Sequence, residues 1–206
     1  MTYTLVADGT SDAVLMPVLD WSLRQRGIAR IVPQWADFTR MPRLRGIEAR
    51  LTAALDLYPC DVLFVHRDAE AQPPDLRREE IAKALRGTSV QHVPVVPVRM
   101  TEAWLLADEF AIRSAAGNPR GTGTLNLPDL RRLEDVPEPK RVLHDALIAA
   151  CGLNARRRGL LSVHLRYRLI PNYIDDYSRL SVLSAFRMLQ EDIARLIENI
   201  GLDARR

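Results

Sequence analysis

Strand-like and helix-like segments alternate through the first 116 residues, and this alternation restricts the available folds more than any other feature. Apolar or β-branched runs predict strands over residues 2–7, 28–35, 61–66 and 91–98. Apolar residues at helical spacing predict helices between them, over residues 10–26, 42–57 and 75–85, and another over 102–116. A strand–helix alternation of this kind indicates an α/β fold with a mostly parallel sheet and right-handed crossovers.

The composition of each run also predicts where its strand lies in the sheet. The third run contains Val62-Leu63-Phe64-Val65, which is continuously apolar and typical of a central strand buried on both faces. Pro33 interrupts the second run, and Pro94 and Pro97 interrupt the fourth. Because proline cannot donate a ladder hydrogen bond, we expect these two strands at or near the edges of the sheet.

The second half of the chain reads as helical after a long loop. Residues 117–138 are rich in Gly, Pro, Asn and charge, and helical patterns follow over 140–150, 154–168 and 178–200. A boundary near residue 117 would separate an α/β core from a helical part, unless the helices simply pack on the sheet. We predict a three-layer α/β domain over residues 1–150 and a C-terminal helical extension over 151–206 that packs on it.

Charge and hydropathy suggest where such a chain works and what it meets. Its 206 residues carry a formal net charge of +3, a mild excess that fits a nucleic-acid partner without requiring one. The basic segment with Arg156, Arg157 and Arg158 could follow a nucleic-acid backbone, or form a solvated helix face. No apolar stretch is long enough to cross a membrane and no secretory leader is evident, so we expect no membrane association and a cytoplasmic protein.

Acidic residues follow three of the predicted strands. Asp8 follows the first strand, Asp68 and Glu70 follow the third, and Glu102 follows the fourth. The carboxyl ends of parallel strands form the edge where ligands bind in open α/β folds, and Mg²⁺ prefers oxygen ligands. If the chain stays extended past the third strand, Asp68 and Glu70 face the same side as ligands of one Mg²⁺ or Mn²⁺ ion, which Glu102 could complete. His66 is expected to have a structural role.

Neighbouring polar residues have two readings each. Asp8 could orient water or act as a general base, and Asp12 could be catalytic or simply cap the first helix. Lys140, at the start of a helix, could reach a phosphate or be plain surface. Arg67 and Arg99 could bind phosphate or neutralise the adjacent acids.

These motifs together resemble a known family. A strand followed by Asp8-Gly9-Thr10-Ser11-Asp12, a strand followed by Asp68-Ala69-Glu70, and Glu102-Ala103-Trp104-Leu105-Leu106 resemble the TOPRIM-like family catalogued as domain of unknown function 4276. The likeness covers residues 1 to about 150 and implies a three-layer, Rossmann-like sheet. It also implies an acid or base at Asp8, where relatives usually have glutamate, and a Mg²⁺ pair at Asp68 and Glu70, where they usually have aspartates.

The resemblance implies a Mg²⁺-dependent nuclease or nuclease subunit. Such small proteins look like partners of an ATPase in bacterial anti-phage or mobile-element systems, and since this sequence lacks a Gly-x-x-x-x-Gly-Lys-Ser/Thr loop, ATP dependence would come from a partner. Two alternatives stay open: a catalytically degenerate module that binds a protein or nucleic acid, motivated by Asp8 in place of glutamate, and another phosphoryl-transfer enzyme such as a phosphatase. Assembly into a homo-oligomer is also left open.

Overall fold

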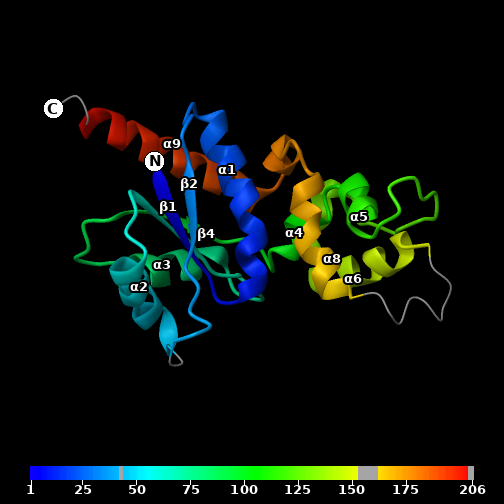
Figure 1. The fold of residues 1–206 in the computed structure, drawn as a ribbon, viewed down its shortest axis with the longest axis horizontal. Helices are drawn as coiled ribbons and strands as arrows, with labels where there is room; N and C mark the ends of the chain where they lie inside the picture. The colour runs from blue at the N-terminus through cyan, green and yellow to red at the C-terminus, as the bar shows by residue number, and fades with distance from the viewer. Residues whose placement is uncertain (42–43, 153–161, 204–206) are drawn as a thin grey trace.

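A computed structural model describes residues 1–41, 44–152 and 162–203 (Figure 1). Its centre is a four-stranded sheet in the order β2-β1-β3-β4, with every neighbouring pair parallel. The strands are β1 (Thr2–Val6), β2 (Val32–Trp35), β3 (Val62–His66) and β4 (Gln91–Val95). The predicted α/β class and parallel sheet are therefore confirmed.

The predicted strand positions are confirmed as well. All five residues of β3 are buried, and β3 pairs with β1 on one side and β4 on the other. β2 and β4, which contain Pro33 and Pro94, are the two edge strands. Edge positions tolerate these prolines because only one side of an edge strand needs its backbone donors.

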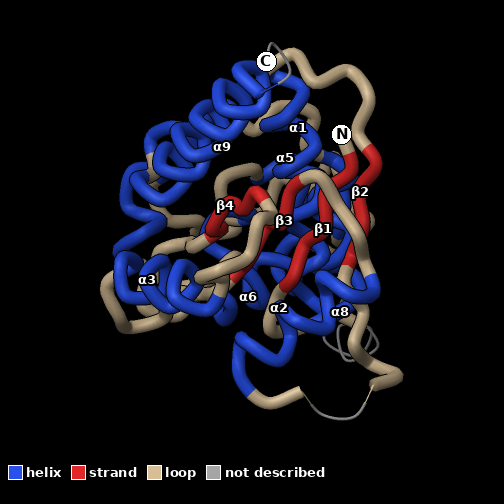
Figure 2. The backbone as a smooth tube through the Cα atoms, turned by 90° about the vertical axis from the view of Figure 1, so that its left-hand side faces the viewer, coloured by secondary structure: helices blue, strands red, loops and turns tan. Residues whose placement is uncertain are grey.

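Helices cover both faces of the sheet (Figure 2). The first crossover contains a 3₁₀ helix, η1 (Thr10–Leu15), and α1 (Met16–Gln25), and the others contain α2 (Gly46–Leu57) and α3 (Pro74–Ala84). One apolar core lies on the α1 face and includes Leu5 and Phe64, whereas a second core on the α2–α3 face includes Leu63 and Val65. This two-faced packing explains why β3 is apolar along its whole length.

The predicted helix over 102–116 is wrong in one respect, because it is broken in two. α4 (Glu102–Leu105) ends after a single turn and α5 (Glu109–Ala115) begins after Asp108. Asp108 has an extended backbone, and its Oδ1 accepts a hydrogen bond of 2.8 Å from the amide of Ala111. An aspartate in this position caps a new helix instead of continuing the old one. Another 3₁₀ helix, η2 (Leu130–Asp135), lies within the predicted loop.

The remaining helices build a second group beside the sheet and then return to it (Figure 1). α6 (Pro139–Ala150) and α8 (Val163–Leu169) pack together, and η3 (Ile170–Tyr173) and η4 (Ser178–Val182) lead to α9 (Ser184–Asp203). Residues 153–161 of the helix predicted over 154–168 lie outside the described residues. α9 packs against β4 and α1, where Phe186 meets Trp104 of α4 edge-to-face at 5.6 Å between ring centroids. Trp104 is only 2% exposed and therefore anchors α4 in the core.

The strand order creates a switch point between β1 and β3. The chain leaves β1 through α1 on one face and leaves β3 through α3 on the other. In open α/β sheets, ligands bind in the crevice outside the carboxyl ends of strands where such a reversal occurs. The residues that directly follow β1 and β3 therefore lie where a ligand is expected to bind. In the part of the chain that the structure describes, no helix is long and apolar enough to cross a membrane.

Candidate functional site

Charged side chains at the carboxyl edge of the sheet divide between its two faces. Along β3, Phe64 belongs to the core on the α1 face and Val65 to the core on the α2–α3 face. Because side chains alternate along an extended chain, His66 and Asp68 continue the α1 side and Arg67 continues the other. Two separate charge systems result, and they differ in chemistry.

On the α1 side, three carboxylates influence one another, and we call Asp12, Asp68 and Glu102 the carboxylate cluster. Burial, assisted by the charge of Asp12, raises the pKa of Asp68 above the ordinary aspartate value, although His66 opposes the change. Burial likewise raises the pKa of Glu102, which is only 7% exposed, and the charges of Asp68 and Asp12 add to this effect. Buried acids that repel one another are a common signature of a functional site.

Asp12 reaches the cluster from the first turn of η1. Its Oδ2 accepts a hydrogen bond of 3.0 Å from the amide of Gly9, and its Oδ1 accepts one of 3.2 Å from Ser11 Oγ. The expected capping role is therefore confirmed, since the carboxylate satisfies a backbone donor at the start of the helix. The same buried carboxylate acts on Asp68 and Glu102, so capping and membership of the cluster occur together.

Thr101 orients Asp68, and His66 lies against both of them. His66 Nδ1 lies 2.9 Å from the carbonyl oxygen of Val95, and since a carbonyl only accepts, Nδ1 carries a proton. Nε2 therefore faces the cluster, 3.4 Å from Asp68 Oδ1 and 3.8 Å from Asp12 Oδ2. Thr101 donates its backbone amide to Asp68 Oδ1 at 3.0 Å, and its hydroxyl lies 3.2 Å from His66 Nε2.

Sequence reasoning gave Thr101 no role and His66 only a structural one. Their signals were present but weak: Thr101 directly precedes Glu102, and His66 has the same strand parity as Asp68. The buried ring of His66 is structural, as expected, and it also holds one side of the carboxylate cluster.

The side chain of Lys140 adds a positive charge to this site. It lies in the first turn of α6, where a positive charge is unfavourable because the helix N-terminus is itself positive. Lys140 and Glu102 line the same cavity, and the charge of Lys140 lowers the pKa of Glu102 against the dominant effect of burial. The structure thus brings together four of the residues singled out in the sequence, namely Asp12, Asp68, Glu102 and Lys140.

On the α2–α3 side, Asp8 belongs to a network of alternating charges. Its Oδ1 lies 3.1 Å from Arg50 and its Oδ2 lies 2.8 Å from Arg67 Nε. The second contact is an ion pair without hydrogen-bond geometry, because Arg67 Nε has no partner along its N–H direction. Arg67 also donates to Glu80 at 2.8 Å. Arg67 was expected either to bind phosphate or to neutralise adjacent acids, and in this structure it is paired with the acids Asp8 and Glu80.

Glu70 does not share a face with Asp68, contrary to the extended geometry we expected. Its backbone has a φ of 56°, a left-handed conformation that ends the alternation of the strand. Its side chain lies 3.7 Å from Arg77, which also pairs with Glu80 at 3.1 Å. Glu70 therefore completes the network of Asp8, Arg50, Arg67, Glu80 and Arg77, and it is separate from the carboxylate cluster.

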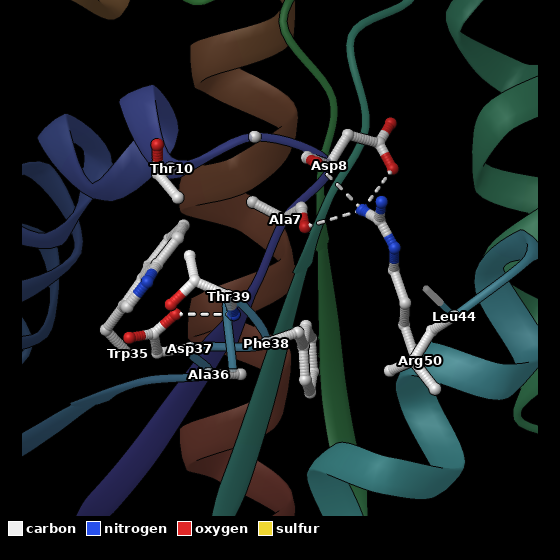
Figure 3. A pocket seen from close by; sticks show the side chains of 11 residues that line it. Ala7, Asp8, Thr10, Trp35, Ala36, Asp37, Phe38, Thr39, Leu44 and Arg50 are labelled. Carbon is white, nitrogen blue, oxygen red and sulfur yellow. Dashed lines mark hydrogen bonds and ion pairs between the residues drawn. The ribbon is translucent and has the colours of Figure 1, made fainter. Parts of the chain in front are cut away.

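A cavity of about 220 Å³ opens beside Asp8, between the ends of β1 and β2 (Figure 3). Arg50 crosses one end of it and donates to the carbonyl oxygens of Ala7 at 3.0 Å and Asp8 at 2.9 Å. Trp35 and Phe38 contribute aromatic walls. This cavity lies on the side of the charge network, so it does not expose the carboxylate cluster.

The remaining predicted basic residues are spread out. Arg99 has a left-handed backbone with a φ of 66°, and its carbonyl oxygen accepts a hydrogen bond of 2.7 Å from the amide of Glu70. The run from Arg156 to Arg158 lies outside the described residues. Arg168 of α8, in contrast, donates to Thr10 Oγ1 at 3.2 Å and so places a positive charge beside the first turn of η1.

The carboxylate cluster offers oxygen ligands that suit a hard cation, but it does not form a complete coordination shell. Among the described residues, no group of three or more His, Cys, Asp or Glu side chains is arranged to hold a metal ion. Mg²⁺ is commonly bound by only one or two carboxylates, with waters and substrate phosphate oxygens filling its shell. Asp68 and Glu102 fit that mode, because Glu102 is buried, Asp68 is half-buried, and each has a raised pKa that a nearby cation would oppose.

Comparison with known proteins adds no family to this description. No protein-family model, no curated protein and no solved structure matches the chain significantly. The site must therefore be interpreted from its own geometry.

Proposed function

We propose that this chain is a metal-dependent phosphodiesterase of TOPRIM-like type that acts on nucleic acid, as a nuclease or the nuclease subunit of a complex. The observation that supports it is the convergence of Asp12, Asp68 and Glu102, with Lys140 beside them, at the switch point of a parallel sheet. Anionic substrates need such a cation and such ligands, since carboxylates alone would repel a phosphate.

In this proposal each residue has a separate role: metal binding, neutralisation of the phosphate, or positioning of a metal ligand. Asp68 and Glu102 hold Mg²⁺ or Mn²⁺, and Asp12 contributes its charge from the first turn of η1. The bound ion would supply charge neutralisation at the phosphate and activation of the attacking water. Lys140 neutralises a non-bridging phosphate oxygen as a point charge. Thr101 keeps the Asp68 carboxylate in one orientation, and His66 lies 3.2 Å from the Thr101 hydroxyl, so both are positioning residues.

A polymer suits this site better than a small phosphate ester. The cavity beside Glu102 and Lys140 has a volume of about 170 Å³, below the roughly 300–1,000 Å³ of sites that enclose a drug-sized ligand. Arg168 of α8 reaches the near edge of the site by its hydrogen bond to Thr10 of η1, and the net charge of the chain is +3. Substrate backbone lying along this edge would meet cationic side chains before and after the cluster.

The test is cleavage of labelled single- and double-stranded DNA and RNA with Mg²⁺ or Mn²⁺. We expect cleavage that chelation abolishes and that falls at least about a hundredfold in an Asp68→Asn, Glu102→Gln variant. Asp135→Asn is the control, since Asp135 is exposed and lies on η2. Equal cleavage by the double variant and the control would refute the proposal. The resemblance also predicts an ATPase partner, which would be needed for the full rate.

A second candidate function is that of a binding module that has lost catalytic activity. The specific observation in its favour is that Asp8, where relatives carry the acid or base, is paired with Arg50 and Arg67. This candidate predicts metal-dependent binding of nucleic acid with no cleavage under any metal. The same set of labelled substrates, followed by gel shift as well as by product formation, separates the two functions.

A further inference from the structure

The cavity of about 170 Å³ between α6 and α8 opens directly beside the carboxylate cluster. Leu143, Leu147 and Val163 give its lining an apolar part, and His144 and His164 line it from the same two helices. Ser11, Glu102 and Lys140 also line it. A cavity that combines apolar side chains with a few convergent polar groups is the usual form of a small-molecule subsite, and this one, at about 170 Å³, has room for a single ring-sized group.

Tyr167 gives this cavity an unused hydrogen-bonding group. The residue is 8% exposed, and in the described part of the chain its phenolic oxygen is buried without any hydrogen-bond partner. Burial raises the pKa of this phenol, and the neighbouring carboxylates of Glu102, Asp12 and Asp68 raise it further, so the hydroxyl stays a donor. Leaving such a group unpaired destabilises the free protein, which a ligand in the cavity would reverse.

We propose that this cavity binds the nucleobase next to the reacting phosphate, with Tyr167 Oη hydrogen-bonded to the edge of the base and Lys140 to the phosphate. The inference rests on the proposed function, because the cluster beside the cavity is where that phosphate would lie. A base taken out of its stack is recognised in this way, by apolar side chains on its faces and hydrogen bonds at its edge. The wall of Leu143, Leu147 and Val163 supplies the first and Tyr167 the second.

Binding of small probes tests the subsite without any cleavage. The probes are the four 5′-mononucleotides, with ribose 5-phosphate as the probe that lacks a base, measured by calorimetry with Mg²⁺ present. Tyr167→Phe removes only the hydroxyl, and we expect it to weaken binding of the preferred mononucleotide by about three- to tenfold. Val163→Phe fills the cavity from its partly buried edge and should weaken binding more than tenfold.

The controls make a negative result informative. Tyr173→Phe removes a phenol from an exposed residue on η3 and should bind like the wild type. Neither cavity variant should change binding of ribose 5-phosphate, and Tyr167→Phe should melt no lower than the wild type because its hydroxyl is unpaired. Mononucleotides that bind no better than ribose 5-phosphate, or that bind both folded cavity variants like the wild type, would overturn the subsite.

This result is separable from that of the proposed function. Carboxylate-dependent cleavage without base-dependent binding would refute the subsite and leave the nuclease standing. Base-dependent binding that Val163→Phe abolishes, with no cleavage of any substrate, would refute the nuclease and leave the subsite standing.

Discussion

The backbone amide of Thr101 donates a hydrogen bond of 3.0 Å to Oδ1 of Asp68, and this bond joins the end of β3 to the first turn of α4. Glu102 is the next residue, so this bond restrains the Asp68 carboxylate relative to the backbone that carries Glu102. A site held in this way loses little conformational entropy when it binds a cation.

The carboxylate cluster should make the metal-free protein less stable than it could be. Burial is the main reason that the pKa of Glu102 is raised, so its ionised form is disfavoured in the folded state. Glu102→Gln keeps the shape and removes the charge, and we expect it to stabilise the metal-free protein at pH 7.5 by about 0.5–2 kcal/mol, or a few degrees in Tm. Thermal melting in chelator measures this. A lower Tm for the variant would contradict the account.

The stabilisation of the metal-free protein by Glu102→Gln should increase with pH. Because the pKa values of Glu102 and Asp68 are raised, the folded protein binds more protons than the unfolded chain between the ordinary and the raised values. Their contribution to stability is therefore largest below the ordinary carboxyl pKa and declines as pH rises through the raised pKa. The Tm advantage of Glu102→Gln over the wild type should be large at pH 7.5 and shrink toward pH 4. An advantage that grows on acidification would be the wrong sign.

Asp8 and Asp12 should differ sharply when each is changed to asparagine. Asp12→Asn removes one charge of the cluster and should lower the cleavage rate about a hundredfold. Asp8 has a side chain that is 52% exposed and pairs with Arg50 and Arg67, so Asp8→Asn should keep cleavage within tenfold and cost less than about 1 kcal/mol of stability. Rates under equal Mg²⁺, with circular dichroism to confirm folding, decide this. A severe loss in Asp8→Asn alone would show that the ion pairs open during the reaction.

Phe186 should be the main apolar link between α9 and the rest of the fold. It is fully buried, and it packs against Trp104 at 5.6 Å and Trp21 at 6.2 Å between ring centroids. Phe186→Ala should therefore destabilise the protein by about 3–5 kcal/mol in urea unfolding. Phe110→Ala is the matched control, since Phe110 is 61% exposed, and it should stay within about 0.5 kcal/mol of the wild type. A loss for Phe186→Ala as small as that expected for Phe110→Ala would mean that α9 contributes little to the core.

The sheet was predictable because its signals are local. The continuous apolar run of β3 and the prolines of β2 and β4 determine centre and edges through burial and backbone donors, without reference to distant residues. The broken helix was not predicted, because the apolar pattern continues through Asp108 and only its side-chain cap to Ala111 ends the periodicity.

The site was predictable only in part, for a related reason. Strand parity correctly separates Asp68 from Arg67, but it does not extend to Glu70. The backbone of Glu70 is left-handed, and its amide donates a hydrogen bond to the carbonyl oxygen of Arg99. The proximity of Asp12, Glu102 and Lys140 arises from tertiary packing of η1, α4 and α6, and no spacing in the sequence encodes it. Arg50, which pairs with Asp8 from α2, had no sequence signal at all.

The most direct test of the central claim is calorimetric titration of Mg²⁺ and Mn²⁺ at pH 7.5 into two matched double variants and the wild type. One variant, Asp68→Asn, Glu102→Gln, removes two charges from the carboxylate cluster, and the other, Asp8→Asn, Glu70→Gln, removes two from the ion-pair network. We predict that the wild type and the Asp8, Glu70 variant bind metal with similar affinity and that the Asp68, Glu102 variant does not bind. Metal binding that survives in the Asp68, Glu102 variant and is lost in the Asp8, Glu70 variant would contradict the account.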